Sequence, residues 1–303
     1  MRPLRGIFLM MTAVTIFTVM TALIKAAGRV PAGEAVFFRA VPTVVGLFVW
    51  LVFKGRLYEG LYTQNWRGHV LRGLAGSMAM GLSFAGLKYL PLPEVTALRF
   101  ATPILIVLFA AVLLGERIRM IRVSAVAVGL IGVVVILWPR LTLEGSSREL
   151  FGAAIVLGSA TLAAFAQIFV KSMAGKESTV AIVFYFSATA SVLSLLTVPF
   201  GWVWPTGEEF ALLLTAGAIG GFGQLILTTS YRHAEAGVLA PFTYISMLWA
   251  ILIGWFFFAE VPTVPMLAGS SLIILAGVAI VLRERQLGLK RAAEAKVRAR
   301  VMQ

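Results

Sequence analysis

The sequence predicts an all-α polytopic membrane protein with ten transmembrane helices in two inverted five-helix repeats. Three observations lead to this prediction. Of the 303 residues, 60% are hydrophobic and only 13% are charged, which is not the composition of a soluble surface. Apolar runs of about 18 to 22 residues recur along the chain, each long enough to cross a hydrocarbon core of roughly 30 Å as a helix. Finally, the second half of the chain contains a weaker copy of part of the first half.

The copy relates residues 93–137 to residues 237–282. With a shift of 144 residues, Glu116 in LLGER falls on Glu260 in FFAEV, and with a shift of 145 the run IGVVVIL falls on AGVAIVL. Five helices per half is an odd number, so the second half enters the membrane from the opposite side and a site is expected between the halves. We place the first repeat at 1–139, an outer connecting loop at 140–149, the second repeat at 150–282 and a basic tail at 283–303.

The apolar runs give the helices in chain order. The first run is too long for a signal peptide and is read as a retained helix. In the first half we expect helices over 6–27, 32–53, 68–87, 93–114 and 119–138. In the second half we expect them over 150–171, 179–199, 208–230, 237–258 and 264–282, with only the short SYRHAEAG between the eighth and the ninth. Runs such as IGVVVILW do not alternate, so a transmembrane barrel is rejected.

The distribution of basic residues predicts the orientation. With the N-terminus inside, the inner loops and the tail hold 18 of the 26 lysines and arginines, and the outer loops hold four. We therefore expect a multi-pass protein of the cell inner membrane with both termini cytoplasmic. The same asymmetry accounts for the formal net charge of +13, so no nucleic-acid partner is inferred. The basic tail either lies against anionic lipid headgroups or is solvated.

These features resemble the drug/metabolite transporter superfamily and its ten-helix EamA type. The residues that carry the resemblance are the run PILIVLFAAVLLGE ending at Glu116, the FFR of Phe37 to Arg39, and FFFAE before AGVAIVL. The resemblance implies a transporter of small organic metabolites, often an exporter of amino acids, including aromatic ones. It also implies that the fifth and tenth helices pack at the back of a bundle with a central cavity. One departure is that Pro103 is matched by Met247, with Pro241 six residues earlier, so any helix break is expected to be displaced in the second half.

Charged residues inside predicted spans are costly and mark candidate functional positions. Glu34 and Arg39 repeat the spacing of Glu94 and Arg99, and all four are predicted to lie in the outer third of the bilayer with Lys25 at the same level. We expect Arg39 and Arg99 to bind a substrate carboxylate or to close an outer gate with Glu34 and Glu94. Static ion pairs, or side chains that reach the interface, are the alternative. Lys25, Glu34 and Glu94 are thus candidates for gating or coupling.

Polar, aromatic and methionine side chains at mid-membrane form a second set of substrate-binding candidates. Hydrogen bonds between helices and simple packing are the alternative roles for this set. Small residues on the third and eighth helices, including Gly217 and Gly221, fit a close approach of helices. Glu116 and Glu260 are expected to tie their helix ends to the next helix. The candidates of the second set are Met78, Ser83, Phe84, Phe100, Phe165, Gln167, Gln224, Tyr244 and Trp249.

Several motifs are missing from the sequence. It contains no GxxxxGK[ST] loop, no cysteine and no aspartate, and its two histidines are not spaced as metal ligands, so neither a cofactor nor a metal is predicted. The leading hypothesis is a secondary transporter that moves a small organic solute with an anionic group by alternating access. An uptake carrier for a vitamin or nucleoside-like metabolite is the alternative. A channel and, more remotely, a polytopic lipid-modifying enzyme are also considered.

Overall fold

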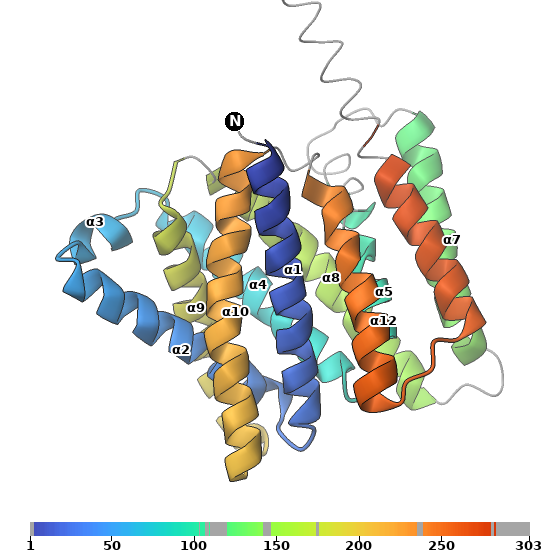
Figure 1. Ribbon diagram of the computed structural model, residues 1–303, viewed down its shortest axis with the longest axis horizontal. Coiled ribbons are helices and arrows are strands. Elements are labelled where there is room, and N and C mark those ends of the chain that lie inside the picture. The colour runs from blue at the N-terminus through green and yellow to red at the C-terminus, as the bar shows by residue number, and fades with distance from the viewer. Residues whose placement is uncertain are drawn as a thin grey trace, which may run out of the picture.

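The computed structural model describes residues 3–102, 104–106, 109, 120–141, 147–173, 176–234, 239–279 and 282. Its regular elements in these ranges are helices (Figure 1). Leu4–Ala26, Ala32–Phe53, Ser147–Val170 and Gly207–His233 are long and apolar enough to cross a membrane. Shorter apolar helices cover Ala127–Pro139, Thr179–Leu195, Phe242–Phe258 and Val264–Ala279.

The helices of the first half follow the predicted order. They are α1 (Pro3–Ala26), α2 (Ala32–Phe53), the short α3 (Leu57–Leu61) in a predicted loop, α4 (Trp66–Gly86), α5 (Leu92–Arg99) and α7 (Met120–Leu141). The predicted fourth helix is broken, because α5 ends at Arg99 and Phe100 forms a turn before the chain becomes helical again at 101–102. The predicted end of this helix at 114, and Glu116 beyond it, lie outside the described residues.

In the second half the eighth and ninth helices are separate, as predicted. The elements are α8 (Ser147–Met173), α9 (Thr179–Leu195), the 3-10 turn η1 (Val198–Phe200), α10 (Gly207–His233), the 3-10 turn η2 (Ala240–Tyr244), α12 (Ile245–Phe258) and the final helix Val264–Ala279. The change from 3-10 to α-helix after Tyr244 matches the turn at Phe100 with a shift of 144 residues. The 3-10 turn η2 begins at Ala240, beside Pro241, and ends at this counterpart of Phe100. The irregular stretch of the second half therefore begins earlier than the turn at Phe100, in the direction of the displaced proline.

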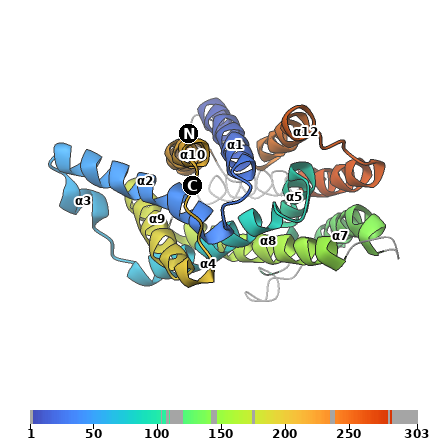
Figure 2. The ribbon, with the colours of Figure 1, turned by 90° about the horizontal axis from the view of Figure 1, so that it is seen from below.

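The helices pack reciprocally between the two halves (Figures 1 and 2). Helix α1 packs on α10 and α4 on α8, while α10 packs on α2 and α4 on α9. If the two halves of the chain are exchanged, the contact of α1 with α10 becomes that of α8 with α4, and the contact of α2 with α10 becomes that of α9 with α4. The contacts of α2 with α9 and of α5 with α12 are unchanged by the exchange. Two copies of one unit related by a two-fold axis produce this arrangement.

Helix α7 and the helix Val264–Ala279 lie side by side at one edge of the bundle (Figure 1). Gly132 and Gly269 make this contact close. A Cβ on Gly132 would lie 2.7 Å from the carbonyl oxygen of Gly269, and a Cβ on Gly269 would collide with the carbonyl oxygen of Gly132. The backbones touch because neither residue has a side chain. The expectation that the fifth and tenth helices pack together away from the centre is met.

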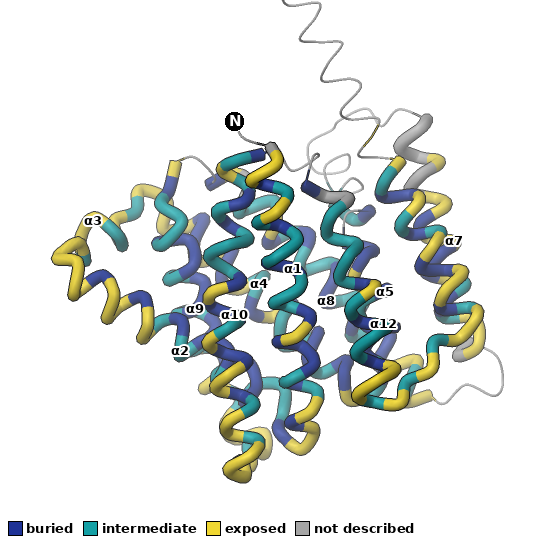
Figure 3. The backbone as a smooth tube through the Cα atoms, in the orientation of Figure 1, coloured by how far each residue is buried: buried dark blue, intermediate teal, exposed yellow. Residues whose placement is uncertain are grey.

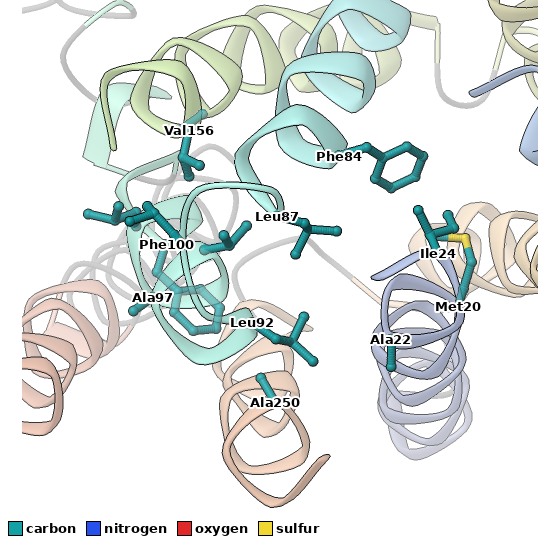
Figure 4. Close-up of a cluster of buried hydrophobic side chains, with 14 of the residues drawn as sticks. Met20, Ala22, Ile24, Phe84, Leu87, Leu92, Ala97, Phe100, Val156 and Ala250 are labelled. Carbon is teal, nitrogen blue, oxygen red and sulfur yellow. The ribbon is translucent and has the colours of Figure 1, made fainter. Parts of the chain in front are cut away.

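The buried core lies between the helices, while outward faces carry exposed apolar side chains (Figure 3). Phe53 and Phe222, for example, are 86% and 61% exposed, which fits contact with lipid in a multi-pass membrane protein. Helix α1 ends, and α2, α5 and α10 begin, at the same end of the bundle. We call this end the Lys25 end. The cluster in Figure 4 draws side chains from both halves, among them Met20, Ile24, Phe84, Leu92, Phe100, Val156 and Ala250.

Candidate functional site

Lys25 and Glu260 connect the two halves at the Lys25 end. The Lys25 ammonium donates to Oε1 of Glu260, which follows α12 after Ala259 ends that helix with a φ of 53°. Oε2 of Glu260 accepts the backbone N–H of Leu92 at 2.9 Å. One carboxylate thus holds the end of α1 and the start of α5. Glu260 was predicted to tie its helix to the next helix in the chain. That partner is wrong, because the carboxylate contacts Lys25 and Leu92 of the first half instead.

Glu34 lies in the first turn of α2, as predicted, and is 2% exposed. Its Oε2 accepts the backbone N–H of Val203 at 3.1 Å. Glu34 also lines a pocket of about 560 Å³ at the Lys25 end. Most of the pocket's wall is aromatic, with Phe37, Phe38, Trp202, Trp204 and Phe210 among its residues. An aromatic-rich surface at this level is typical of a membrane interface.

Arg39 does not pair with Glu34. Residues five apart on a helix are separated by roughly 140° around its axis, so the two side chains leave α2 on different faces. Arg39 is 2% exposed, and the contact of its guanidinium with Thr43 Oγ1 is a long 3.5 Å. Its Nε has no hydrogen-bond partner among the residues that the structure describes. In this structure Arg39 neither pairs with Glu34 nor reaches the interface, and its part in a gate stays a prediction.

A glycine of α10 makes room for the Arg39 side chain. A Cβ on Gly220 would lie 2.6 Å from Arg39 Nε, closer than real Cβ contacts allow. Met20 of α1 contacts the same glycine. Arg39 is thus enclosed where α2 faces α1 and α10, inside the bundle and away from lipid.

Arg99 is the last residue of α5 and is exposed. Within the described ranges it has neither an ion pair nor a side-chain hydrogen bond. Glu94 is buried in the first turn of the same helix. The spacing of five again puts the two side chains on different faces, so Arg99 does not pair with Glu94 in this structure, and a gate that involves these residues stays a prediction. Arg99 is accessible to a solute, and its binding role stays a prediction.

Arg72 is a functional candidate that the sequence reasoning missed. It lies on α4, is 8% exposed, and holds its guanidinium over the ring of Phe186 on α9 at 4.1 Å. Its Nε and Nη1 have no hydrogen-bond acceptor in the described part of the chain. The sequence did show Arg72 as a third arginine inside the predicted spans of the first half. It was passed over because no glutamate precedes it at the five-residue spacing of Glu34–Arg39 and Glu94–Arg99.

His69 and Glu177 meet at the opposite end of the bundle. His69 Nε2 lies 3.5 Å from Glu177 Oε2, and both residues are buried. Glu177 Oε1 also accepts the backbone N–H groups of Gln64 and Asn65, each at 3.2 Å. The His69 ring packs 4.8 Å from the ring of Tyr185. This cluster joins the start of α4 to the start of α9.

The structure brings two members of the second candidate set together. Phe100 and Tyr244 lie edge to face with ring centroids 4.9 Å apart. Phe165 instead stacks on Phe109 at 4.6 Å. Met78 is 53% exposed and lies on a different face of α4 from Arg72, so it does not line the space around that arginine.

The other members of this set are spread through the bundle. Ser83 and Phe84 are buried, Gln167 is exposed, and Gln224 and Trp249 are half-buried. Ser83 Oγ and Trp249 Nε1 lack hydrogen-bond partners among the described residues. A role in substrate binding stays a prediction for all five residues.

Comparison with known proteins covers almost the whole chain. Residues 4–138 and 150–283 match the family described as the EamA-like transporter family. The pseudopaline exporter CntI of Pseudomonas aeruginosa is 32% identical over 280 residues, which are 91% of this chain and 95% of that relative. An S-adenosylmethionine uptake transporter of Rickettsia prowazekii is 29% identical over 258 residues, 85% of each chain. A riboflavin transporter of Rhizobium johnstonii is 30% identical over 220 residues, 72% of this chain and 71% of that one.

A solved crystal structure has the same fold. It aligns with a TM-score of 0.65 over 93% of this chain and 98% of its own length, at 21% sequence identity. At this level of identity the likeness concerns the fold alone.

Proposed function

This chain belongs to the EamA-like transporter family, and we propose that it exports amino acids, aromatic ones among them, or related compounds across the inner membrane. Its relatives are named as small-molecule transporters rather than enzymes. The proposed mechanism is alternating access, in which the two halves expose a site between them to one side of the membrane and then to the other.

The observation that carries this proposal is the burial of Arg39 without a counter-ion among the residues that the structure describes. A guanidinium enclosed by protein requires a hydrogen-bonding anion, or it costs several kcal/mol in desolvation. Glu34, five residues before it, engages Val203 instead. A carboxylate on the solute would supply the anion, and the planar guanidinium can bind it with two parallel hydrogen bonds.

Export is supported by the name of the pseudopaline exporter. The names of the S-adenosylmethionine uptake transporter and the riboflavin transporter support a second candidate, uptake of a vitamin or nucleoside-like metabolite. The two candidates differ in direction and in solute. Inverted vesicles accumulate the solute of an exporter, and right-side-out vesicles accumulate that of an uptake carrier.

Transport by the purified protein in proteoliposomes tests the proposal. We expect labelled amino acids to enter, and entry to accelerate when the same compound is loaded on the opposite side, which a channel would not show. Arg39→Ala should abolish this exchange and Arg99→Ala should weaken it. Arg67→Ala is the matched control, because Arg67 is an exposed arginine near the start of α4. Full exchange by a folded Arg39→Ala variant would contradict the proposal.

A further inference from the structure

We propose that the pocket at the Lys25 end binds an organic ammonium group, carried by a lipid headgroup or by a soluble amine. The pocket of about 560 Å³ has a volume that suits a small-molecule site. Its wall comes from both halves of the chain, namely the first turns of α2 and the segment 202–210, which leads into α10. This inference goes beyond the proposed function and does not depend on it.

The acidic residue of this pocket is Glu34, which is 2% exposed. Its Oε2 accepts the backbone N–H of Val203 at 3.1 Å, whereas its Oε1 accepts no hydrogen bond from the residues that the structure describes. Glu34 also forms no ion pair within the described ranges. A carboxylate removed from water in this way needs a cationic partner, because the loss of its hydration is otherwise uncompensated. Oε1 is the oxygen available to such a partner.

Four aromatic rings of the pocket form a continuous wall. Phe210 of α10 packs edge to face on Phe38 of α2, with ring centroids 5.5 Å apart, and Phe38 packs on Phe37 at 5.8 Å. Phe37 in turn lies 5.3 Å from Trp202. The indole N–H of Trp202 donates to Thr197 Oγ1 at 2.9 Å, which holds this ring in place. Aromatic faces attract a cation that comes within about 6 Å of the ring centroid, so this wall and the carboxylate favour the same charge.

The neighbouring charges at this end do not oppose a cation. Arg29 is neutralised, because its guanidinium donates to both carboxylate oxygens of Glu209, at 2.9 Å and 2.8 Å. Glu208 and Glu209 lie in the first turn of α10, where they offset the positive end of the helix dipole.

A belt of aromatic residues at the membrane interface does not by itself explain this pocket. Trp204 lines the pocket and is 95% exposed, as expected for such a belt. Glu34 is nearly inaccessible, and an interfacial belt has no need of a buried carboxylate. Phospholipid headgroups that carry a primary or quaternary ammonium lie at this level of a bilayer, and so do soluble amines that approach the Lys25 end. Both offer the same chemistry to the pocket.

The first test compares two ligands of the same shape. Choline and 3,3-dimethylbutan-1-ol differ in that a positively charged nitrogen of choline is replaced by a neutral carbon. Full-length protein in nanodiscs of phosphatidylglycerol, whose headgroup has no amine, should bind choline at least tenfold more tightly in calorimetry. Equal affinity for the two compounds would overturn the inference, because it would show an apolar pocket without charge recognition.

Variants then locate the ammonium group. Glu34→Gln keeps an oxygen for the Val203 N–H but removes the charge, so choline binding should weaken at least tenfold while binding of the neutral alcohol changes less than twofold. Glu208→Gln, at an exposed position outside the pocket, is the matched control and should change neither affinity. Unchanged choline binding by a folded Glu34→Gln variant would overturn the inference.

A second variant covers the case in which Glu34→Gln does not fold. Phe210 is 45% exposed, so Phe210→Leu should leave the fold intact while removing one ring of the wall. We expect choline binding to weaken at least threefold and binding of the neutral alcohol to change less than twofold. An equal loss for both compounds would overturn the inference.

The lipid composition of the nanodiscs distinguishes the two sources of the ammonium group. If a lipid headgroup occupies the pocket, adding phosphatidylethanolamine or phosphatidylcholine should weaken choline binding at least threefold. Glu34→Gln should abolish selective retention of these lipids in native mass spectrometry. If a soluble amine is the occupant, the same lipids should leave the affinity for choline unchanged. Neither choline binding nor Glu34-dependent lipid retention would overturn the inference.

Arg39→Ala separates this site from the proposed function. It should abolish amino-acid exchange but change choline binding less than twofold, because Arg39 does not line the pocket. Choline binding by a wild-type protein that transports no amino acid would keep the ammonium site and remove the proposed function. Amino-acid exchange without recognition of the choline charge would keep the proposed function and remove the site.

Discussion

Phe100 and Tyr244 lie edge to face with their ring centroids 4.9 Å apart, although 144 residues separate them in the chain. The same shift relates Glu116 to Glu260, so the two rings occupy matching positions of the two halves. Each ring lies where its helix is interrupted, by the turn after α5 or by η2 before α12. The two-fold relation between the halves therefore passes near this contact.

The Phe100–Tyr244 contact should contribute to stability beyond the burial of each ring. We expect a double-mutant cycle with Phe100→Leu and Tyr244→Leu to give a coupling of about 0.5–1.5 kcal/mol in thermal denaturation. The exposed pair Tyr58 and Tyr62, with centroids 5.6 Å apart, is the control and should couple by about 0.3 kcal/mol or less. Equal coupling of the two pairs would show that the buried contact has no special role.

The Lys25–Glu260 ion pair should keep the Lys25 end closed. Glu260→Gln removes the charge that Lys25 contacts, and a coupling of about 1–3 kcal/mol with Lys25→Met is expected in a double-mutant cycle. The chain has no cysteine, so a single Val30→Cys substitution gives a clean probe at a position that is 5% exposed. Glu260→Gln should accelerate labelling of this thiol by a membrane-impermeant reagent. An unchanged labelling rate would contradict a role in closing this end.

Replacing Arg39 by methionine should separate stability from function. The buried guanidinium has no acidic partner in the described part of the chain and costs free energy in the ligand-free protein, whereas methionine fills similar space without a charge. We expect Arg39→Met to melt at the same temperature as the wild type or higher, while losing transport. A melting temperature lowered by more than about 5 °C, about 3 kcal/mol for a chain of 303 residues, would instead identify Arg39 as a structural residue.

The contact between Gly132 and Gly269 should tolerate no side chain. Gly132→Ala and Gly269→Ala each place a methyl group against the facing backbone, and each should destabilise by about 1–3 kcal/mol. Gly46→Ala on α2 is the control, because its Cβ would meet nothing within 4 Å. Since alanine favours a helix over glycine, the control should leave the melting temperature unchanged or raise it. Similar effects at all three positions would argue against a specific contact.

Much of the fold could be predicted, because length and hydropathy determine which segments cross a membrane. The separation of α10 from α12 at SYRHAEAG and the positions of Glu34 and Glu94 in first helical turns were confirmed. The break at Phe100 was not located, because the hydropathy of 93–114 is that of one continuous helix.

The candidate site was predicted less well, for two physical reasons. The repeated spacing in EAVFFR and EVTALR suggested ion pairs, but five residues along a helix turn the side chains apart. Arg72 has no glutamate at a matching distance in sequence, and its burial over the ring of Phe186 depends on how α4 packs on α9. The partners of Lys25 and Glu260 likewise depend on which helix ends meet at one surface, and the sequence does not give that.

The bare backbone contact between α7 and the helix Val264–Ala279 limits how the protein can move. Two helices that touch through glycine have no side chains to slide past one another or to compress. If the two halves move as proposed, we expect these helices to stay together at this contact, because separating them would expose backbone groups. The proposed opening at the Lys25 end should then break the Lys25–Glu260 ion pair while Gly132 and Gly269 keep their contact.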